Sequence, residues 1–232
     1  MNRVCFKYLA IAAMLADHIG ALLLPPGSAV WLVCRMIGRL SCPILCFFLA
    51  EGYRYTASKS RYALRLGLFA CLTQPIYSYA FFGTFWGMEL NILFSFLISF
   101  LMLWSLDTGK SGWYRGMTLF CGLLLSCFCD WGAFAPLLVL AAFWYRENRR
   151  AQCCAYVCIL AAFVVLAVIG DVNANEPWYA SLWQLGTLLS VPLLLLYNGK
   201  PGPRSLFHKW FFYVFYPLHL LSLALVQVGC GI

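Results

Sequence analysis

Long apolar runs fill almost the whole chain, and they restrict the fold more than any other feature of the sequence. A membrane-spanning helix needs about 20 mostly apolar residues to cross about 30 Å of hydrocarbon. The runs have that length and lack the alternating pattern of a membrane β-barrel. Charged residues make up 10% of the 232 residues, whereas a soluble domain carries about 25%. The sequence therefore predicts an all-α, polytopic integral membrane bundle.

We expect about nine membrane helices joined by short loops, in a single domain over 1–232. No internal repeat, low-complexity segment or long linker divides the sequence. The basic first segment is expected to be a retained helix rather than a cleaved signal, because it is long and further spans follow it. The expected helices are 4–24, 29–53, 61–82, 90–106, 113–129, 131–146, 151–170, 179–197 and 206–228.

The basic residues test this arrangement, because Lys and Arg collect in cytoplasmic loops. All but two of the 16 basic residues fall on one side of the predicted membrane, and the opposite loops contain none. This predicts a multi-pass protein of the cytoplasmic membrane with a cytoplasmic amino terminus and an outer carboxyl terminus. It also explains the net charge of +8 without a nucleic-acid partner. The loop residues are Arg3, Lys7, Arg54, Lys59, Arg61, Arg65, Lys110, Arg115, Arg146, Arg149, Arg150, Lys200, Arg204 and Lys209.

An aspartate and a histidine, Asp17 and His18, interrupt the first apolar run. An ionisable group at membrane depth costs about 2.5 to 3.5 kcal/mol on insertion scales, so such groups usually face the interior and serve a function. Consecutive residues of a helix point about 100 degrees apart. We therefore expect the two side chains to have different partners.

Two arginines, Arg35 and Arg39, lie inside the second predicted helix. From the helical rise, Arg35 is about 9 Å and Arg39 about 15 Å below the outer boundary, and His18 is about 9 Å below it. The arginines share a helix face and repel each other unless an anion offsets their charges. The candidates for that anion are Asp17, Asp130, and a phosphate or carboxylate of a ligand. An ion pair that only ties helices together is the structural alternative.

Further polar side chains are expected at a similar depth. Gln74 precedes a proline in the third predicted helix, Asn91 begins the fourth, and His219 follows Pro217 in the last. Each of them can orient His18 or stabilise the oxyanion of a tetrahedral intermediate. Their structural alternatives are an interhelical hydrogen bond, a helix cap and a histidine satisfied within the core.

The 12 cysteines are scattered without CxxC pairs or His-spaced ligand clusters. We therefore expect no metal site, and most cysteines should be small packing residues. A pairing between Cys129 and Cys230, near the predicted outer face, is left open.

Six strings carry a resemblance to a known family. They are MLADHIG at 14–20, IGRLSCPILCFFLAEGYRYT at 37–56, RLGLFACLTQPIY at 65–77, LNILF at 90–94, DWG at 130–132 and KWFFYVFYPLHLL at 209–221. In identity, order and spacing they resemble the TraX family of polytopic membrane proteins over nearly the whole chain. The resemblance implies amino-terminal acetylation of a pilin. It also implies a place among transmembrane acyltransferases that use cytoplasmic acetyl-CoA or another acyl-CoA as donor.

A second resemblance is the spacing of Lys7 and His18, which enclose ten residues. The acyltransferase-3 family has a similar basic-x10-His pattern in its first helix. Eleven residues of helix cover about 16 Å, which the phosphopantetheine arm of coenzyme A can span. The resemblance implies a donor whose phosphates contact cytoplasmic cations while its thioester lies near His18. The candidate phosphate-binding cations are Lys7, Arg54, Arg61, Arg65 and Lys209.

These observations make His18 the candidate general base on an amine or hydroxyl acceptor, because an imidazole titrates near neutral pH. An acyl-histidine intermediate is the alternative. Asp17 should pair with Arg35 or Arg39. The catalytic candidates are His18, Asp17 and His219, and the supporting candidates are Arg35, Arg39, Gln74, Asn91 and Asp130.

The acceptor is left open among a pilin, a glycan, a lipid and a small amine, located in the membrane or outside it. Two other classes of function remain. One is a proton-coupled transporter, for which intramembrane Asp, His and Arg are also typical, although the sequence lacks internal repeats. The other is a non-enzymatic pilus or envelope assembly protein. No HExxH or GxGD motif favours an intramembrane protease.

Overall fold

The computed structural model describes residues 1–108, 111–200, 202–203 and 205–230, and these residues form an all-α bundle. The predicted all-α class is confirmed for this part of the chain. Lys110 and Arg204, two of the basic loop residues, lie outside it. The elements are α1 Arg3–Leu23, α2 Ala29–Gly38, α3 Ser41–Tyr55, α4 Lys59–Phe82, α5 Ile92–Asp107, α6 Gly112–Ser126, α7 Phe134–Trp144, α8 Arg149–Asn173, the 3-10 helix η1 Leu182–Leu189, α9 Ser190–Leu195 and α10 Leu206–Cys230.

Four helical segments of the described chain are long and apolar enough to cross a membrane. They are Arg3–Leu23, Ala29–Tyr55, Arg149–Asn173 and Trp210–Cys230. The apolar helices 92–107, 134–144 and 182–195 are shorter. The protein therefore has the helices of a multi-pass membrane protein, although fewer of them reach full spanning length than the nine that the sequence predicts.

The second predicted helix, 29–53, is interrupted in the structure. α2 ends at Gly38 and α3 begins at Ser41. Pro43 explains the break, because a proline has no N–H to donate to the carbonyl four residues earlier and its ring collides with that carbonyl, here that of Arg39. The eighth predicted helix, 179–197, is likewise divided into η1 and the short α9.

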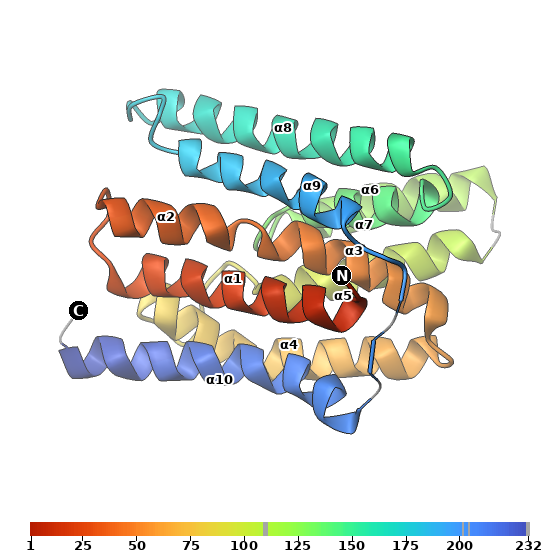
Figure 1. Ribbon diagram of the computed structural model, residues 1–232, viewed down its shortest axis with the longest axis horizontal. Helices are drawn as coiled ribbons and strands as arrows, with labels where there is room; N and C mark the ends of the chain where they lie inside the picture. Colours follow the sequence, from red (N-terminus) through yellow and green to blue (C-terminus); the bar gives the residue numbers. More distant parts are fainter. Residues whose placement is uncertain (109–110, 201, 204, 231–232) are drawn as a thin grey trace.

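α1 lies in the middle of the bundle, where it packs against α2, α3 and α10. Figure 1 shows the helices running roughly side by side, so that their connections gather at two ends of the molecule. On the far sides, α4 packs between α10 and α5, and α8 packs on α7 and η1. This arrangement places Asp17 and His18 of α1 between α2 and α10.

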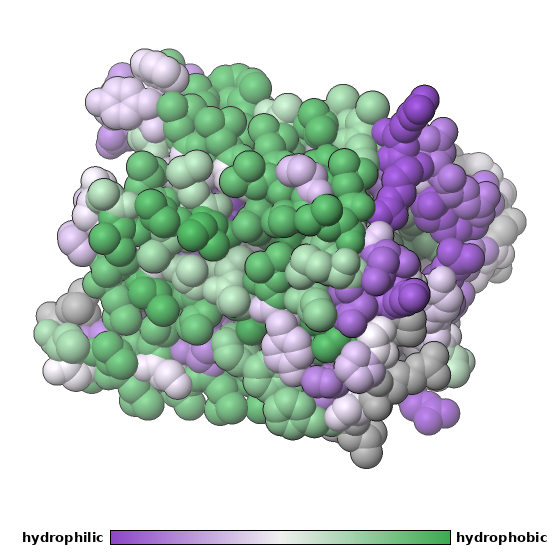
Figure 2. Space-filling view, in the orientation of Figure 1, coloured by the Kyte–Doolittle hydropathy of each residue, from purple (hydrophilic) through white to green (hydrophobic). Residues whose placement is uncertain are grey.

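Polar residues gather at one end of the molecule, as Figure 2 shows, while the surface between the two ends is mostly hydrophobic. We call this the basic end, because the ends of α3, α4 and α8 and the loop before α8, which lie there, carry Arg54, Lys59, Arg149 and Arg146. Large apolar side chains such as Leu64, Phe120 and Leu225 are exposed on the sides of the bundle. Apolar surface of this extent is typical of contact with lipid.

α1 and α2 approach each other closely next to the ionisable residues. A Cβ atom on Gly38 would lie 2.1 Å from the Cβ of Asp17. Only glycine leaves room for this approach, which brings the Asp17 side chain directly against the end of α2.

Candidate functional site

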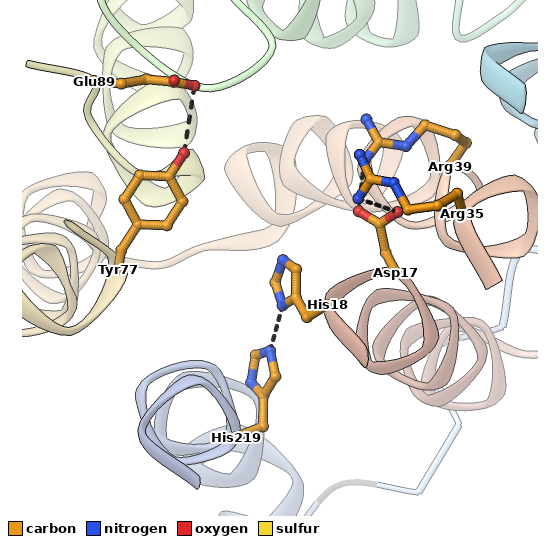
Figure 3. A network of polar contacts seen from close by, with 7 residues as sticks. All are labelled: Asp17, His18, Arg35, Arg39, Tyr77, Glu89 and His219. Carbon is orange, nitrogen blue, oxygen red and sulfur yellow. Dashed lines mark hydrogen bonds and ion pairs between the residues drawn. The ribbon is translucent and has the colours of Figure 1, made fainter. Parts of the chain in front are cut away.

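Two buried histidines from opposite ends of the sequence meet inside the bundle. His18 Nδ1 is 2.6 Å from His219 Nε2, and His219 Nδ1 is 2.8 Å from the carbonyl oxygen of Phe215 (Figure 3). A carbonyl only accepts, so Nδ1 of His219 carries its proton and its neutral Nε2 accepts the Nδ1–H of His18. His18 Nε2 therefore keeps its lone pair, and in Figure 3 this nitrogen points away from His219.

Asp17 binds both arginines of the second predicted helix. Its Oδ1 accepts a hydrogen bond from Arg35 Nη1 at 2.9 Å, and its Oδ2 accepts one from Arg39 Nη2. The predicted pairing of Asp17 with Arg35 or Arg39 is thus seen with both. A single carboxylate neutralises one of the two positive charges, which leaves the cluster with a net charge of +1.

Two tryptophans cover the guanidinium groups. Arg35 and Arg39 lie 4.2 and 4.8 Å from the ring centroid of Trp183, and Arg39 lies 5.2 Å from that of Trp131. Stacking of this kind is attractive and also excludes water. Trp131 has a positive φ of 66°, unusual for a large residue, and its ring stacks on Phe163 at 4.8 Å. The sequence-based reasoning missed Trp183, whose one signal is an aromatic residue near a predicted helix end.

A cavity of about 280 Å³ lies beside this cluster. We call it the arginine cavity. Its lining includes Asp17, His18, Arg35, Arg39, Asp130 and Gln184.

The loop between α6 and α7 brings Asp130 to the arginine cavity. Asp130 N donates to Leu90 O at 2.8 Å, and Ser95 Oγ donates to Asp130 O at 2.6 Å. Removal from water raises the pKa of the Asp130 carboxyl to about 6, against the opposing effect of Arg39. This loop residue therefore changes its charge close to neutral pH.

Gln74 and Asn91 form a separate contact. Asn91 donates through its backbone N and its Nδ2 to Gln74 Oε1, at 2.9 and 2.8 Å. The Asn91 Oδ1 caps α5 at Leu93 N. Gln74 Nε2 donates to Ser78 Oγ and to the Glu89 carbonyl. These amide donors are thus engaged in fastening α4 to α5, and neither residue lines the arginine cavity.

A larger cavity, of about 550 Å³, opens near the basic end. We call it the basic-end cavity. Arg3, Lys7, Arg65 and His208 line it, and so does Tyr216, whose ring centroid is 6.3 Å from that of His18. Met14, one helical turn before His18, also lines it. The basic-end cavity thus comes close to His18 through Met14 and Tyr216, whereas His18 itself lines the arginine cavity.

The basic residues predicted to contact phosphates fall into two groups in the structure, those that line the basic-end cavity and those that do not. Lys7 and Arg65 line the basic-end cavity, whereas Arg54 and Arg61 do not. The side chain of Lys209 lies outside the described residues. Sequence reasoning missed His208, which bonds the Tyr8 hydroxyl at 2.8 Å. Its only signal is a histidine beside a basic loop.

None of the cysteines, all of which lie in the described part of the chain, lines the arginine cavity or the basic-end cavity. Cys129 and Cys230, the pair left open by the sequence, are free thiols in the structure. Cys42 and Cys46 are buried on one face of α3 with their sulfur atoms 3.8 Å apart.

A family model described as TraX protein matches residues 2–227. The chain is 30% identical to a probable fimbrial assembly protein, FimC of serogroup H1, from Dichelobacter nodosus, over 94% of this chain and 92% of that protein. It is 24% identical to an uncharacterized protein of Rickettsia prowazekii (strain Madrid E), over 88% and 82% of the two chains. A shorter likeness, 29% identity over 45% of this chain and 68% of the relative, is to a fluoride-specific ion channel of Xylella fastidiosa (strain 9a5c). No solved structure matches.

Proposed function

Because the chain belongs to the TraX family, we propose that it is a membrane-embedded acyltransferase. It moves an acetyl or other acyl group from acyl-CoA to an amine or hydroxyl acceptor in the membrane or beyond it. The observation that carries the proposal is the hydrogen-bonded chain from the Phe215 carbonyl through His219 to His18. This chain leaves a buried imidazole with a free lone pair beside a cavity, which is what a general base requires.

The basic-end cavity suits the donor. It combines an apolar interior with Arg3, Lys7 and Arg65. The Nε of Arg65 is buried and has no hydrogen-bond partner among the described residues. A buried charged donor without an acceptor is costly and calls for a ligand atom. We assign the phosphates of coenzyme A to these cations and the pantetheine arm to the apolar part that leads toward Tyr216.

The proposed step is a direct transfer. His18 Nε2 takes the proton of the acceptor N–H or O–H while the acceptor atom attacks the thioester carbonyl carbon. The carbon–sulfur bond then breaks, and the leaving thiolate takes that proton back from His18. The products are the acylated acceptor and free coenzyme A. His219 acts as a positioning residue, because its Nε2 holds the Nδ1–H of His18 and stabilises the transient imidazolium.

The proposed transfer implies an orientation of the protein in the membrane. We propose that the basic end faces the cytoplasm, where acyl-CoA is made, and that the arginine cavity is reached from the membrane or the outer side. The positive-inside distribution supports this orientation. We propose that the protein lies in the cytoplasmic membrane, with nine passes if α4, α6 and the three shorter apolar helices cross in addition to the four long spans.

The acceptor is proposed to be a component of pilus assembly, with pilin as the first candidate. The support is the similarity to a protein named for probable fimbrial assembly. A glycan, a lipid or a small amine of the envelope satisfies the same chemistry.

The test uses the full chain in nanodiscs with radiolabelled acetyl-CoA and a cell-envelope extract. We expect His18→Gln to lower acetyl transfer by about 10²- to 10⁴-fold. The matched control is Gln152→Ala, which removes a buried side chain that donates to the Ala142 carbonyl of α7 and should stay within about threefold of wild type. Undiminished transfer by the His18 variant would refute its role as the base.

A non-enzymatic assembly protein is the second candidate, and the name of the Dichelobacter relative favours it. Such a protein needs neither acyl-CoA nor His18. Absence of coenzyme A binding by calorimetry, together with normal pilus assembly in a His18→Gln strain, would establish this candidate in place of the enzyme.

The partial likeness to a fluoride channel calls for one further control. Proteoliposomes that release fluoride in the absence of acyl-CoA would indicate a channel. The proposed enzyme should release none above empty liposomes.

A further inference from the structure

Two arginines that line the arginine cavity carry buried hydrogen-bond donors that the described residues leave without acceptors. The Nε atoms of Arg35 and Arg39 are both buried and lack a partner among these residues. In Figure 3 the two guanidinium groups lie beside each other against the Asp17 carboxylate. An unsatisfied donor on a charged group is among the most costly buried groups, so two of them on residues that line one cavity favour a ligand that supplies an acceptor.

The charges around the cavity favour an anion when Asp130 is protonated, because two arginines then face one carboxylate; with Asp130 ionised, above its pKa of about 6, the four formal charges cancel. Asp17 offsets one of the two arginine charges. Asp130 also lines the cavity, but within the described ranges it makes no ion pair with either arginine at 4.0 Å or less. The stacked indole of Trp183 keeps water from one face of both guanidinium groups, which strengthens their attraction for a ligand charge.

The same cavity contains an acceptor that lacks a donor. Gln184 Oε1 is buried and has no hydrogen-bond partner in the part of the chain that the structure describes. His18, with its free Nε2 lone pair, is a second acceptor on the lining. A ligand that satisfies all these atoms has an anionic group at one end and an N–H or O–H group at the other.

We infer that the arginine cavity selects acceptors by an anionic group, a carboxylate or a phosphate, that lies a few bonds from the amine or hydroxyl to be acylated. The anion receives the Nε–H groups of Arg35 and Arg39, and the nucleophile lies toward Gln184 and His18. This inference rests on the proposed function for the identity of the ligand as acceptor. A volume of about 280 Å³ holds a small amino acid or a phosphorylated amine, or the corresponding end of a larger molecule.

Asp130 is compatible with an anionic ligand. Its carboxyl has a raised pKa of about 6 because of removal from water, with further contributions from Glu89 and Asp17. The bound anion would favour the protonated form still more, and a protonated carboxyl donates a hydrogen bond. Asp130 can therefore become a third donor.

The first experiment compares pairs of small amines that differ in the anion. Ethanolamine phosphate is paired with ethanolamine, and β-alanine with β-alaninamide. Binding to the full chain in nanodiscs is measured by calorimetry without acyl-CoA, and acetyl transfer is measured with labelled acetyl-CoA. We expect the anionic member of at least one pair to bind about tenfold more tightly, or more, than its neutral counterpart. Equal binding within twofold for both pairs would overturn the inference.

The second experiment changes the arginines. Arg35→Lys and Arg39→Lys keep the positive charge but lose the rigid guanidinium donors. Each should reduce the preference for the anionic amine to about threefold or less, while Arg146→Gln, an exposed arginine outside both cavities, should leave it unchanged. Variants that fail to fold are identified by size exclusion, and the wild-type comparison above then decides alone. A preference that survives both folded lysine variants would contradict the assignment.

The two hypotheses fail separately. Tight binding of the anionic amine without any acetyl transfer would refute the proposed enzyme and support the anion site. Equal acetylation of charged and neutral amines would support the proposed enzyme and refute the anion site. Nanodiscs of phosphatidylethanolamine distinguish a lipid source of the same chemistry: label recovered in the lipid assigns the site to a headgroup, and label in the soluble amine assigns it to a free acceptor.

Discussion

His18 Nδ1 lies 2.6 Å from His219 Nε2, although the two residues are 201 positions apart in the chain. Their contact depends on α1 and α10 packing side by side in the bundle. Because the Phe215 carbonyl fixes the proton on Nδ1 of His219, His219 accepts the hydrogen bond and His18 donates it. His18, which lines the arginine cavity, keeps its free nitrogen on the side away from His219.

The first prediction concerns the hydrogen bond that His18 donates to His219. His219→Phe removes the acceptor for His18 Nδ1–H, so we expect kcat for acetyl transfer to fall by about 10²-fold or more while KM for acetyl-CoA changes less than threefold. His219→Gln retains an oxygen acceptor and should recover part of the loss. The measurement is initial rates over pH about 6 to 9. A deficit in the Phe variant that appears only in KM would show that His219 shapes the donor site instead.

The second prediction concerns the close approach of α1 and α2. In Gly38→Ala the new Cβ would lie 2.1 Å from the Cβ of Asp17, so the helices must separate at a cost of about 1 to 3 kcal/mol. We expect a lower thermal unfolding midpoint in detergent and weaker acetyl transfer. The matched control is Gly116→Ala in α6, where a Cβ meets no atom within 4 Å. Equal effects of the two substitutions would contradict the predicted clash.

The sequence predicts the all-α class because hydrophobic composition and run length decide it without tertiary detail. It is less informative about helix continuity. The run 29–53 appears as one span, yet Pro43 ends hydrogen bonding at Arg39 and produces the break between α2 and α3. In 179–197 the apolar pattern does not distinguish a regular α-helix from the 3-10 helix that the structure contains.

The third prediction separates two arginines that the sequence treats alike. Arg65 lines the basic-end cavity with a buried Nε that has no partner among the described residues, and Arg61 is exposed outside it. We expect Arg65→Gln to raise KM for acetyl-CoA by about tenfold and Arg61→Gln to change it less than twofold. Calorimetry with free coenzyme A provides the independent measurement. Equal losses in both variants would indicate a general effect of surface charge.

Depth along single helices predicts part of the candidate site. It places Asp17 with Arg35 and Arg39, because the carboxylate and guanidinium groups lie at a similar level on adjacent helices. It does not show which side chains face each other, so Gln74 and Asn91 appear equivalent to His219 as partners of His18. Trp183 escapes prediction for a related reason: its contact with the arginines depends on how η1 packs on α2.

The last prediction uses the ionisation of Asp130. Its folded-state pKa of about 6 exceeds the ordinary value of 3.8, so the folded protein holds this proton more tightly than the unfolded chain. Below about pH 4 both states are protonated. As the pH rises from about 4 to 6 the unfolded state releases its proton first, and the stability contributed by this group falls. The Asp130→Asn variant has no carboxyl group to ionise at this position, so it should lose no stability from this site over that pH range. The free energy of unfolding of the variant, relative to that of wild type, should therefore rise by an amount on the order of 1 kcal/mol between about pH 4.5 and 7. Thermal unfolding midpoints of both proteins over this pH range provide the measurement. A difference that stays constant with pH would show that Asp130 keeps its ordinary pKa.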